Sequence, residues 1–192
     1  MPLWLKNLAA TAHFIVPEGL EQWMSAKGVK QVTPMAWWQE ETILSELKVT
    51  CCPAQHFSAR SPFDQNQSHW CGWMIEWRGK KIYNSGDSGY CPHFQEIGQR
   101  LGPMDLSFIS IGAYAPRNIM KPVHVTPEEA LDLHADVQSK LSIACHWGTY
   151  RLTAEPISEP VRRLLQGKEK REIPDAAFRV LPIGGTVMIP VT

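Results

Sequence analysis

Three loops of the sequence each carry an imidazole or a carboxylate at the end of a predicted buried strand. His56 lies in the stretch PAQHFSAR, Asp87 in SGDSGY and His146 in ACHWGTY. A fourth residue, His124, stands in MKPVHVTPEEA, immediately before a capped helix. Imidazole nitrogens and carboxylate oxygens are the donors that a zinc-type ion accepts. As a set, these four residues indicate a candidate metal site.

Each of these residues also has an ordinary structural explanation when it is taken alone. An Asp in a Gly-Asp-Ser-Gly turn is more often an Asx-turn residue, and His146 is equally well explained as a hydrogen-bonded buried histidine. Strand alternation turns Cys145 away from the face of its neighbour, so we interpret it as a core thiol. The remaining histidines lack the strand-end placement and are assigned structural roles: His13, His69, His93 and His134.

The elements that must position these loops alternate along the chain. Thr126 as cap, Pro127 in the first position and Glu129 three residues after the cap predict the start of a helix over 126–140. Glycines close two other predicted helices. The pattern predicts a mixed α/β fold in one domain, residues 1–192, with helices covering the sheet. The predicted strands are 13–17, 47–54, 69–77, 81–85, 104–112 and 141–146, with a closing antiparallel pair at 178–185 and 186–191; the helices are 17–28, 92–102, 126–140 and 159–166.

Composition excludes several classes of function. Lys and Arg number 19, and so do Asp and Glu, which argues against a nucleic-acid binder because such proteins need a basic surface. No apolar run is long enough for a membrane span, and the start of the chain is a poor signal peptide. Five cysteines without a repeating spacing indicate reduced thiols. We therefore expect an intracellular protein, either cytoplasmic or peripheral on a membrane.

The sequence resembles the metallo-β-lactamase superfamily and, within it, the branch of N-acylphosphatidylethanolamine-hydrolysing phospholipases D. The resemblance lies in the stretches PAQHFSAR, GDSGYCPHFQEIGQRLGPMDL, IGAYAPRNIMKPVHVTPEEAL and HWGTYRLTAEP. It implies an αββα four-layer sandwich with a dinuclear zinc site on its edge. It also implies a phosphodiesterase that uses Zn²⁺ to release an N-acylethanolamine from the phospholipid and leave phosphatidate.

The resemblance also implies a role for each candidate residue. His56 matches a ligand of the first metal, Asp87 the carboxylate that bridges both metals, and His146 a ligand of the second metal. His124 matches an active-site histidine near the scissile phosphate and is not itself a ligand. Two metals about 3.5–4 Å apart can share one carboxylate and activate a bridging hydroxide. Asp87 and His124 are therefore the expected catalytic residues.

One part of the family's pattern does not occur in the sequence. The motif His-x-His-x-Asp-His, which supplies four further ligands in the family, is found nowhere in the 192 residues. We expect this motif to lie upstream of Met1, so that the sandwich lacks most of its first ββα half. His56, Asp87 and His146 are too few for two ions, so zinc should be partial or missing and the chain alone inactive.

Two other interpretations stay open. The chain could be a non-catalytic, degenerate member of the fold that acts through a partner, or another hydrolase of the same fold, such as a phosphorylated-lactone lactonase. For the phospholipase interpretation the expected partners are a phospholipid substrate and a membrane surface, with no nucleic acid. Apolar sheet residues left without a covering layer would favour association into a homo-oligomer.

Overall fold

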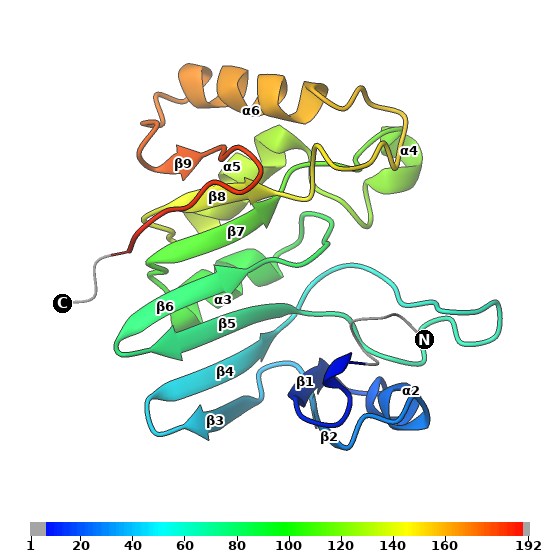
Figure 1. Ribbon diagram of the computed structural model, residues 1–192. Helices are drawn as coiled ribbons and strands as arrows, with labels where there is room; N and C mark the ends of the chain where they lie inside the picture. The colour runs from blue at the N-terminus through cyan, green and yellow to red at the C-terminus, as the bar shows by residue number, and fades with distance from the viewer. Residues whose placement is uncertain (1–6, 190–192) are drawn as a thin grey trace.

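The computed structural model describes residues 7–189, and its largest element is a seven-stranded sheet in the order β3 to β9 (Figure 1). The strands from β3 to β6 pair antiparallel, and those from β6 to β9 pair parallel. The sheet is therefore mixed, as the sequence predicts. Its strands are β3 (Glu40–Leu44), β4 (Leu47–Cys52), β5 (Gly72–Trp77), β6 (Lys80–Asn84), β7 (Leu106–Ser110), β8 (Ser142–Cys145) and β9 (Phe178–Arg179).

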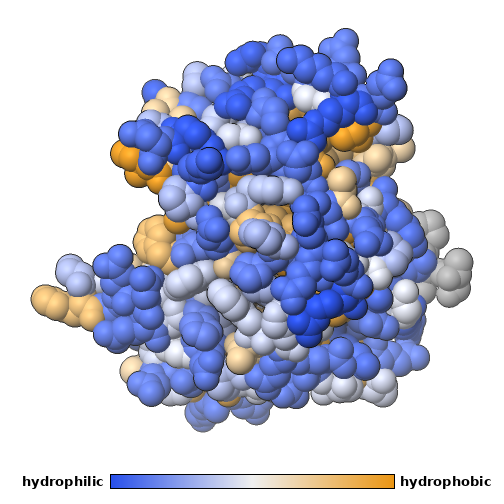
Figure 2. All heavy atoms as spheres, turned by 180° about the vertical axis from the view of Figure 1, so that it is seen from behind, coloured by the Kyte–Doolittle hydropathy of each residue, from blue (hydrophilic) through white to orange (hydrophobic). Residues whose placement is uncertain are grey.

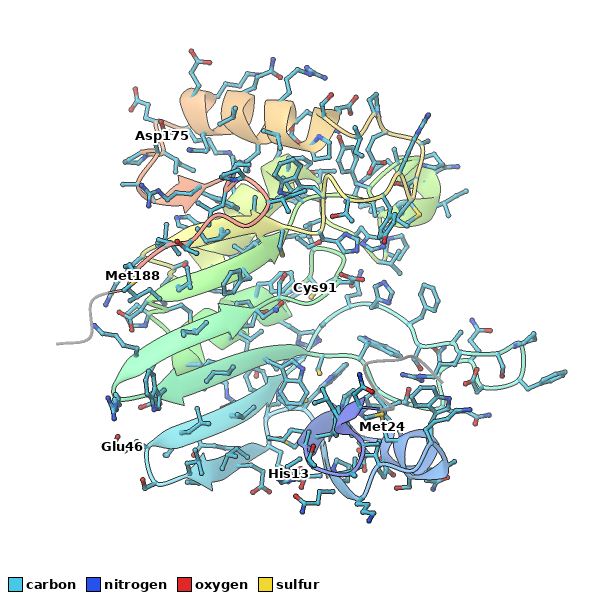
Figure 3. All side chains as sticks on the ribbon, in the orientation of Figure 1. His13, Met24, Glu46, Cys91, Asp175 and Met188 are labelled. Carbon is cyan, nitrogen blue, oxygen red and sulfur yellow. The ribbon has the colours of Figure 1, made fainter. Side chains whose placement is uncertain are left out.

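Strand direction brings the chemically interesting loops to one edge of this sheet. Two antiparallel steps separate β4 from β6, so both run the same way, and β7 and β8 are parallel to β6. The carboxyl ends of all four strands consequently lie at the same edge, on the right in Figure 1. Glu46, Asp175 and Met188 mark the opposite edge (Figure 3).

One face of the sheet carries the main core. Met74, Tyr83 and Ile109 project from the sheet into a buried cluster that includes Phe94 and Leu133 from two helices. These helices lie behind the sheet in Figure 1, and the outer surface of that side is predominantly hydrophilic (Figure 2).

None of the described helices combines the length and the apolar composition needed to cross a membrane. The helices are α3 (His93–Leu101), α4 (Arg117–Met120), α5 (Pro127–Asp136) and α6 (Glu159–Lys170), of which α6 packs on α5.

A smaller unit stands beside the sheet. β1 (His13–Pro17) pairs in parallel with β2 (Gln31–Met35), and α2 (Glu21–Ala26) connects them. This unit has its own small cluster of buried side chains. The cluster consists of Ala9, Val16, Met24 and Val29. Among the described residues, β1 and β2 form the only sheet besides the seven-stranded one.

Three elements and one pairing differ from the sequence prediction. The strands β2 and β3 and the short helix α4 were not predicted, because Pro34 interrupts β2, acidic residues begin β3 and α4 has a single turn. The expected closing pair is wrong. β9 pairs in parallel with β8, and residues 186–189 form no strand, while 190–191 lie outside the described residues.

The start of α5 matches the prediction. Thr126 accepts a hydrogen bond from the Glu129 backbone N–H, and the Glu129 carboxylate accepts one from the Thr126 N–H, which completes a capping box. Pro127 occupies the first turn, where its missing N–H costs nothing. This cap fixes the point at which the chain leaves His124 and enters the helix.

Replacing Thr126 with Ala removes the capping hydroxyl, so we expect the free energy of unfolding to fall by about 0.5–2 kcal/mol. Urea denaturation followed by far-ultraviolet circular dichroism measures this change. Thr126→Ser keeps the oxygen and is the matched control, which should unfold at nearly the wild-type urea concentration. An equal loss in both variants would show that the cap does not stabilise α5.

Candidate metal centre

The four candidate residues line a single cavity of about 540 Å³ at the carboxyl edge of the sheet. His56 comes from the loop after β4, Asp87 from the loop after β6, and His146 directly follows β8. His124 ends the long connection between β7 and α5. The structure thus brings together all four residues that the sequence singled out, although up to ninety residues separate them in the chain.

One residue, Gln55, ties three of these loops together. Its backbone N–H donates to the Ser88 hydroxyl at 2.9 Å, and its carbonyl accepts from the Gly89 N–H at 2.8 Å. Its side-chain amide donates to the Pro122 carbonyl at 2.8 Å. Gln55 therefore fixes the spacing between the neighbours of His56, Asp87 and His124.

The loop that carries Asp87 requires a glycine before it. Gly86 has a φ of +60°, and a Cβ at this position would lie 2.7 Å from the Cys71 carbonyl oxygen. A side chain there would push the loop away from β5. The turn leaves the Asp87 Oδ1 atom 3.4 Å from the His146 Nε2 atom. This contact with the His146 imidazole lowers the pKa of Asp87, although partial burial opposes the shift.

His146 adopts a left-handed backbone conformation, with a φ of +58°, at the end of β8. Such a conformation is uncommon for a residue with a side chain and is often found at functional sites. It is accommodated because Gly112 leaves room, since a Cβ there would lie 2.3 Å from the His146 carbonyl oxygen. The Asp87 carboxylate raises the pKa of His146. The pair therefore favours charge on both partners.

His124 is the most enclosed of the four residues, with only 8% of its surface exposed. Its ring lies 5.3 Å from the ring of His56 and 5.3 Å from that of His146. Burial lowers the pKa of His124 to about 4, and the neighbouring histidines add to the shift while Asp87 opposes it. His124 is therefore neutral at pH 7.

Arg117 supports His124 from the far side, which the sequence did not reveal. Its guanidinium donates to the His124 carbonyl oxygen at 2.5 Å and to both carboxylate oxygens of Glu129, at 2.6 and 2.5 Å. Glu129 is also the acid of the capping box. One ion pair thus links α4, the His124 backbone and the start of α5. The part of this network that the sequence did indicate is the capping box, which contains Glu129.

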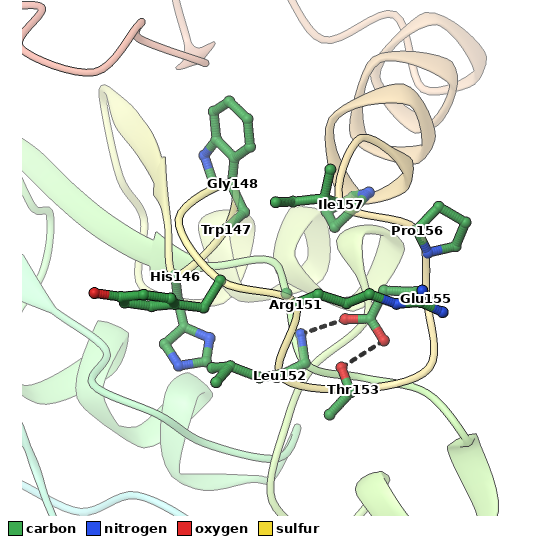
Figure 4. Close-up of a pocket in the computed structure, with 13 residues that line it drawn as sticks. His146, Trp147, Gly148, Arg151, Leu152, Thr153, Glu155, Pro156 and Ile157 are labelled. Atoms are coloured by element: carbon green, nitrogen blue, oxygen red, sulfur yellow. Dashed lines mark hydrogen bonds between the residues drawn. The ribbon is translucent and has the colours of Figure 1, made fainter.

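Glu155 is a second support that sequence reasoning missed. It is buried, and its carboxylate accepts from the backbone N–H groups of Ala113 and Ala115 at 2.6 and 3.1 Å. The Thr153 hydroxyl donates to the same carboxylate at 2.6 Å (Figure 4). These bonds lower the pKa of Glu155 against the effect of burial. Glu155 therefore joins the loop after β7 to the loop that follows His146.

The mouth of the cavity is apolar. Alongside the four polar residues, its walls are formed by aliphatic and aromatic side chains from three loops. Two of these side chains, Ile119 and Leu152, are more than half exposed. The sequence analysis did not identify this wall, because its members share no periodicity. They are Phe57, Ile119, Met120, Val123 and Leu152.

The residues assigned structural roles stay out of the cavity. His13 contacts Thr33, His134 contacts Ser142, and His69 and His93 lie on Trp37. Cys145 does not line the cavity either, and burial raises the pKa of its thiol to about 12.

The imidazole and carboxylate side chains in the cavity are of the types that zinc binds, but they are few. The buried His56 Nε2, His124 Nδ1 and His146 Nδ1 atoms have no hydrogen-bond partner, although such atoms are normally paired, while the other nitrogen of His146, Nε2, faces Asp87. Two donors about 2.0–2.2 Å from a tetrahedral ion lie roughly 3.4 Å apart, which is the spacing between Asp87 and His146. Within residues 7–189, however, no three His, Cys, Asp or Glu side chains converge enough to hold a metal ion. An ion here would need Asp87, His146 and further ligands.

Among known proteins, two phospholipases D are similar to this chain in sequence. The chain is 36% identical to the N-acyl-phosphatidylethanolamine-hydrolyzing phospholipase D 1 of Caenorhabditis elegans, over 94% of this chain and 54% of the relative. It is 31% identical to the mitochondrial N-acyl-phosphatidylethanolamine-hydrolyzing phospholipase D of Saccharomyces cerevisiae, over 85% of this chain and 34% of the relative. The chain thus spans about half, or less, of these relatives' lengths.

Solved structures share the fold. A metallo hydrolase from Ignicoccus hospitalis superposes on 96% of this chain and 72% of its own, with a TM-score of 0.72 and 22% identity. An isothiocyanate hydrolase from Delia radicum gut bacteria covers 100% of this chain and 81% of its own, with a TM-score of 0.73 and 16% identity. These matches confirm the mixed α/β fold class.

The sequence family described as "Beta-lactamase superfamily domain" matches residues 4–147, which is most of the chain and includes His56, Asp87, His124 and His146. The sheet, the edge at which the loops meet and the metal-ligand residue types are all consistent with this match. The chain therefore belongs to the beta-lactamase superfamily, with the fold of its metal-dependent hydrolases.

Proposed function

We propose that this chain forms part of a zinc-dependent phosphodiesterase of the phospholipase D type, which releases an N-acylethanolamine and phosphatidate from N-acylphosphatidylethanolamine. The observation that carries the proposal is the contact between Asp87 and His146 in the lining of a cavity with apolar walls, with His124 beside it. The similarity to the worm and yeast phospholipases D supports this choice of substrate.

Zinc would supply a hydroxide at neutral pH and positive charge for a phosphodiester; Asp87 with His146 would hold one ion and Asp87 with His56 another, each with further ligands. The chain's own residues prepare the site for this. Asp87 is ionised, because its pKa is lowered, and so offers only acceptor oxygens to a cation. His124 is neutral, so its ring can donate one N–H to a phosphate oxygen without adding charge.

The apolar wall suits the rest of such a substrate. Ile119, Met120 and Leu152 line the same cavity as the polar residues, and an acyl chain packed against them would exclude water. Phe63, on the loop that carries His56, and Tyr150, on the loop after His146, are 88% and 76% exposed. Exposed apolar side chains around a site are typical of interaction surfaces, and for a phospholipid substrate we infer contact with a membrane surface.

Replacing Asp87 with Asn should lower zinc affinity by more than tenfold, because a neutral amide is a poorer ligand than a carboxylate and no longer pairs with His146. Isothermal titration with zinc measures this loss, and His146→Ala and His56→Ala should each weaken binding as well. His124→Ala should keep its zinc. In the longest natural form that contains these residues, Asp87→Asn should abolish release of N-acylethanolamine.

The matched control is Asp132→Asn on α5, which loses only an exposed ion pair with Arg171. In that longest form it should bind zinc and turn over like the wild type. Normal turnover by Asp87→Asn in the same form, or a wild-type longest form that holds zinc yet leaves N-acylphosphatidylethanolamine intact, would refute the proposed function.

The low pKa of His124 makes stability depend on pH. The unfolded chain binds a proton on this ring below about pH 6.5, whereas the folded chain does so only below about 4. Stability should therefore be full above pH 6.5 and fall by up to about 3 kcal/mol as the pH drops to 4. Urea denaturation of the zinc-free protein across this range should show a shallower fall for His124→Gln. His146, whose pKa is raised, acts in the opposite direction in both proteins. Parallel curves would show that His124 is not held neutral.

Membrane contact predicts that Phe63→Ser lowers the fraction of protein that sediments with phosphatidylcholine–phosphatidylserine vesicles, by about threefold or more. Ile183→Ser is the matched control, because Ile183 is equally exposed, at 88%, but follows β9 and is not on a loop that carries a candidate site residue. Equal losses for both variants would argue against a specific membrane-facing edge.

A further inference from the structure

Two cysteines lie next to each other near the carboxyl edge of the sheet. Cys51 is the last residue but one of β4 and pairs with Trp73 on β5, and Cys71 stands two residues before Trp73. Because side chains alternate along a strand, Cys51 and Cys71 are placed on the same face of the sheet. Their thiols are hydrogen-bonded to each other, and both are free. The two strands therefore hold a pair of adjacent reduced thiols.

The neighbouring Cys52 belongs to the other face. It pairs with Gly72 in the alternate row, and it is part of the main core cluster. Its thiol donates to the Thr50 carbonyl oxygen at 3.7 Å. The alternation of β4 thus separates two consecutive cysteines and leaves Cys51 as the one that contacts Cys71.

The two thiols of the pair differ in their surroundings. Cys51 is fully buried, whereas Cys71 is partly exposed. Cys71 comes just before β5 and is outside its ladder of paired residues, so strand pairing does not fix its position. The hydrogen bond between the thiols lowers the pKa of Cys51 and raises that of Cys71. Cys71 therefore offers the surface, and Cys51 offers the sulfur that ionises more easily.

Both cysteines are connected to loops that line the cavity. β4 continues past Cys51 into the loop of His56. The Cys71 carbonyl oxygen lies against Gly86, where even an added Cβ would come within 2.7 Å of it. Gly86 directly precedes Asp87, and its N–H donates to the Asn84 side chain at 2.9 Å. Because this contact leaves no space, a displacement of the Cys71 backbone must also shift the loop of Asp87.

We propose that Cys51 and Cys71 form a disulfide when the protein meets a peroxide, and that this bond acts on the loop of Asp87. The Cys71 sulfur first takes an oxygen from hydrogen peroxide: an S–O bond forms, the O–O bond breaks and one water leaves, which gives a sulfenic acid. The Cys51 sulfur then attacks the Cys71 sulfur, so that the S–S bond forms and the S–O bond breaks. The hydroxyl group leaves with the proton of Cys51 as a second water.

Two thiols thus lose two electrons in total, and one peroxide is reduced to two waters. The pair is a redox-sensitive modification site at the edge of the cavity. It does not depend on which substrate the cavity accepts.

Peptide mass spectrometry after treatment with hydrogen peroxide tests the bond. Trypsin releases Cys51 and Cys52 together in the peptide 49–60, and Cys71 in the peptide 61–78. We expect these two peptides to be joined, in a form that dithiothreitol separates. The treatment is carried out at about pH 8.5, because the thiolate is the reactive form and the pKa of Cys71 is raised.

Single substitutions identify the two sulfurs. Cys51→Ala and Cys71→Ser should each lower the yield of joined peptides by about tenfold or more, because one of the two sulfurs is missing. Cys52→Ala should give the wild-type yield. So should Cys145→Ser, the matched control, which removes a partly exposed thiol on β8. Circular dichroism verifies that each variant is folded. Folded wild type that gives no joined peptides would overturn the proposal, and so would a bond that requires Cys52 in place of Cys51.

Amide hydrogen exchange tests the link to the cavity. Oxidation of the wild type should speed exchange across residues 84–90 by about twofold or more, because the hydrogen bonds of the Gly86 and Gly89 N–H groups are disturbed. Cys71→Ser treated with the same peroxide is the matched control, since its methionines meet the same oxidant. Equal exchange before and after the disulfide forms would show that the bond does not act on the loop of Asp87.

Discussion

The shared direction of four strands is the constraint on which the site depends. β4, β6, β7 and β8 all end at one edge of the sheet, although antiparallel steps separate the first two. Each of these ends opens into a loop that supplies a wall or a ligand of the cavity. Because β5 runs antiparallel to both of its neighbours, it lets β4 and β6 run in the same direction and end at the same edge. The pairing of β5 between them therefore helps to place His56 beside Asp87.

Strand ends alone would leave the loops poorly fixed, and three polar side chains complete the positioning. Gln55 bridges the loops of His56, Asp87 and His124, while Glu155 joins the loop after β7 to the loop that follows His146. Arg117 holds the backbone of His124 against α5. Glu155 is buried and Arg117 is half-buried, and such polar groups are stable only when their hydrogen bonds are made, so each permits few local conformations.

The sequence predicted the parts of this arrangement that depend on local patterns. Buried strands with strong periodicity, the capping box of α5, the three strand-end residues and His124 before α5 were all recognisable. The supports were not, because Glu155 and Ala113 are 42 residues apart and such a contact leaves no periodic signal. β3 was missed as a short edge strand, and the closing strands were wrongly paired because residue alternation does not specify the partner. The resemblance to a known family, rather than spacing, suggested the role of each ligand.

The link between α4 and His124 has a consequence for how this protein can change. Ile119 and Met120 form part of the cavity wall, and the same short helix begins with Arg117, which holds the His124 carbonyl. Part of the cavity wall and the support of the His124 backbone are therefore one mechanical unit. A substitution in α4 that widens the cavity must also preserve the contact that holds the His124 backbone in place. Leu152 lies on a separate loop, so a substitution there changes the cavity wall without involving Arg117.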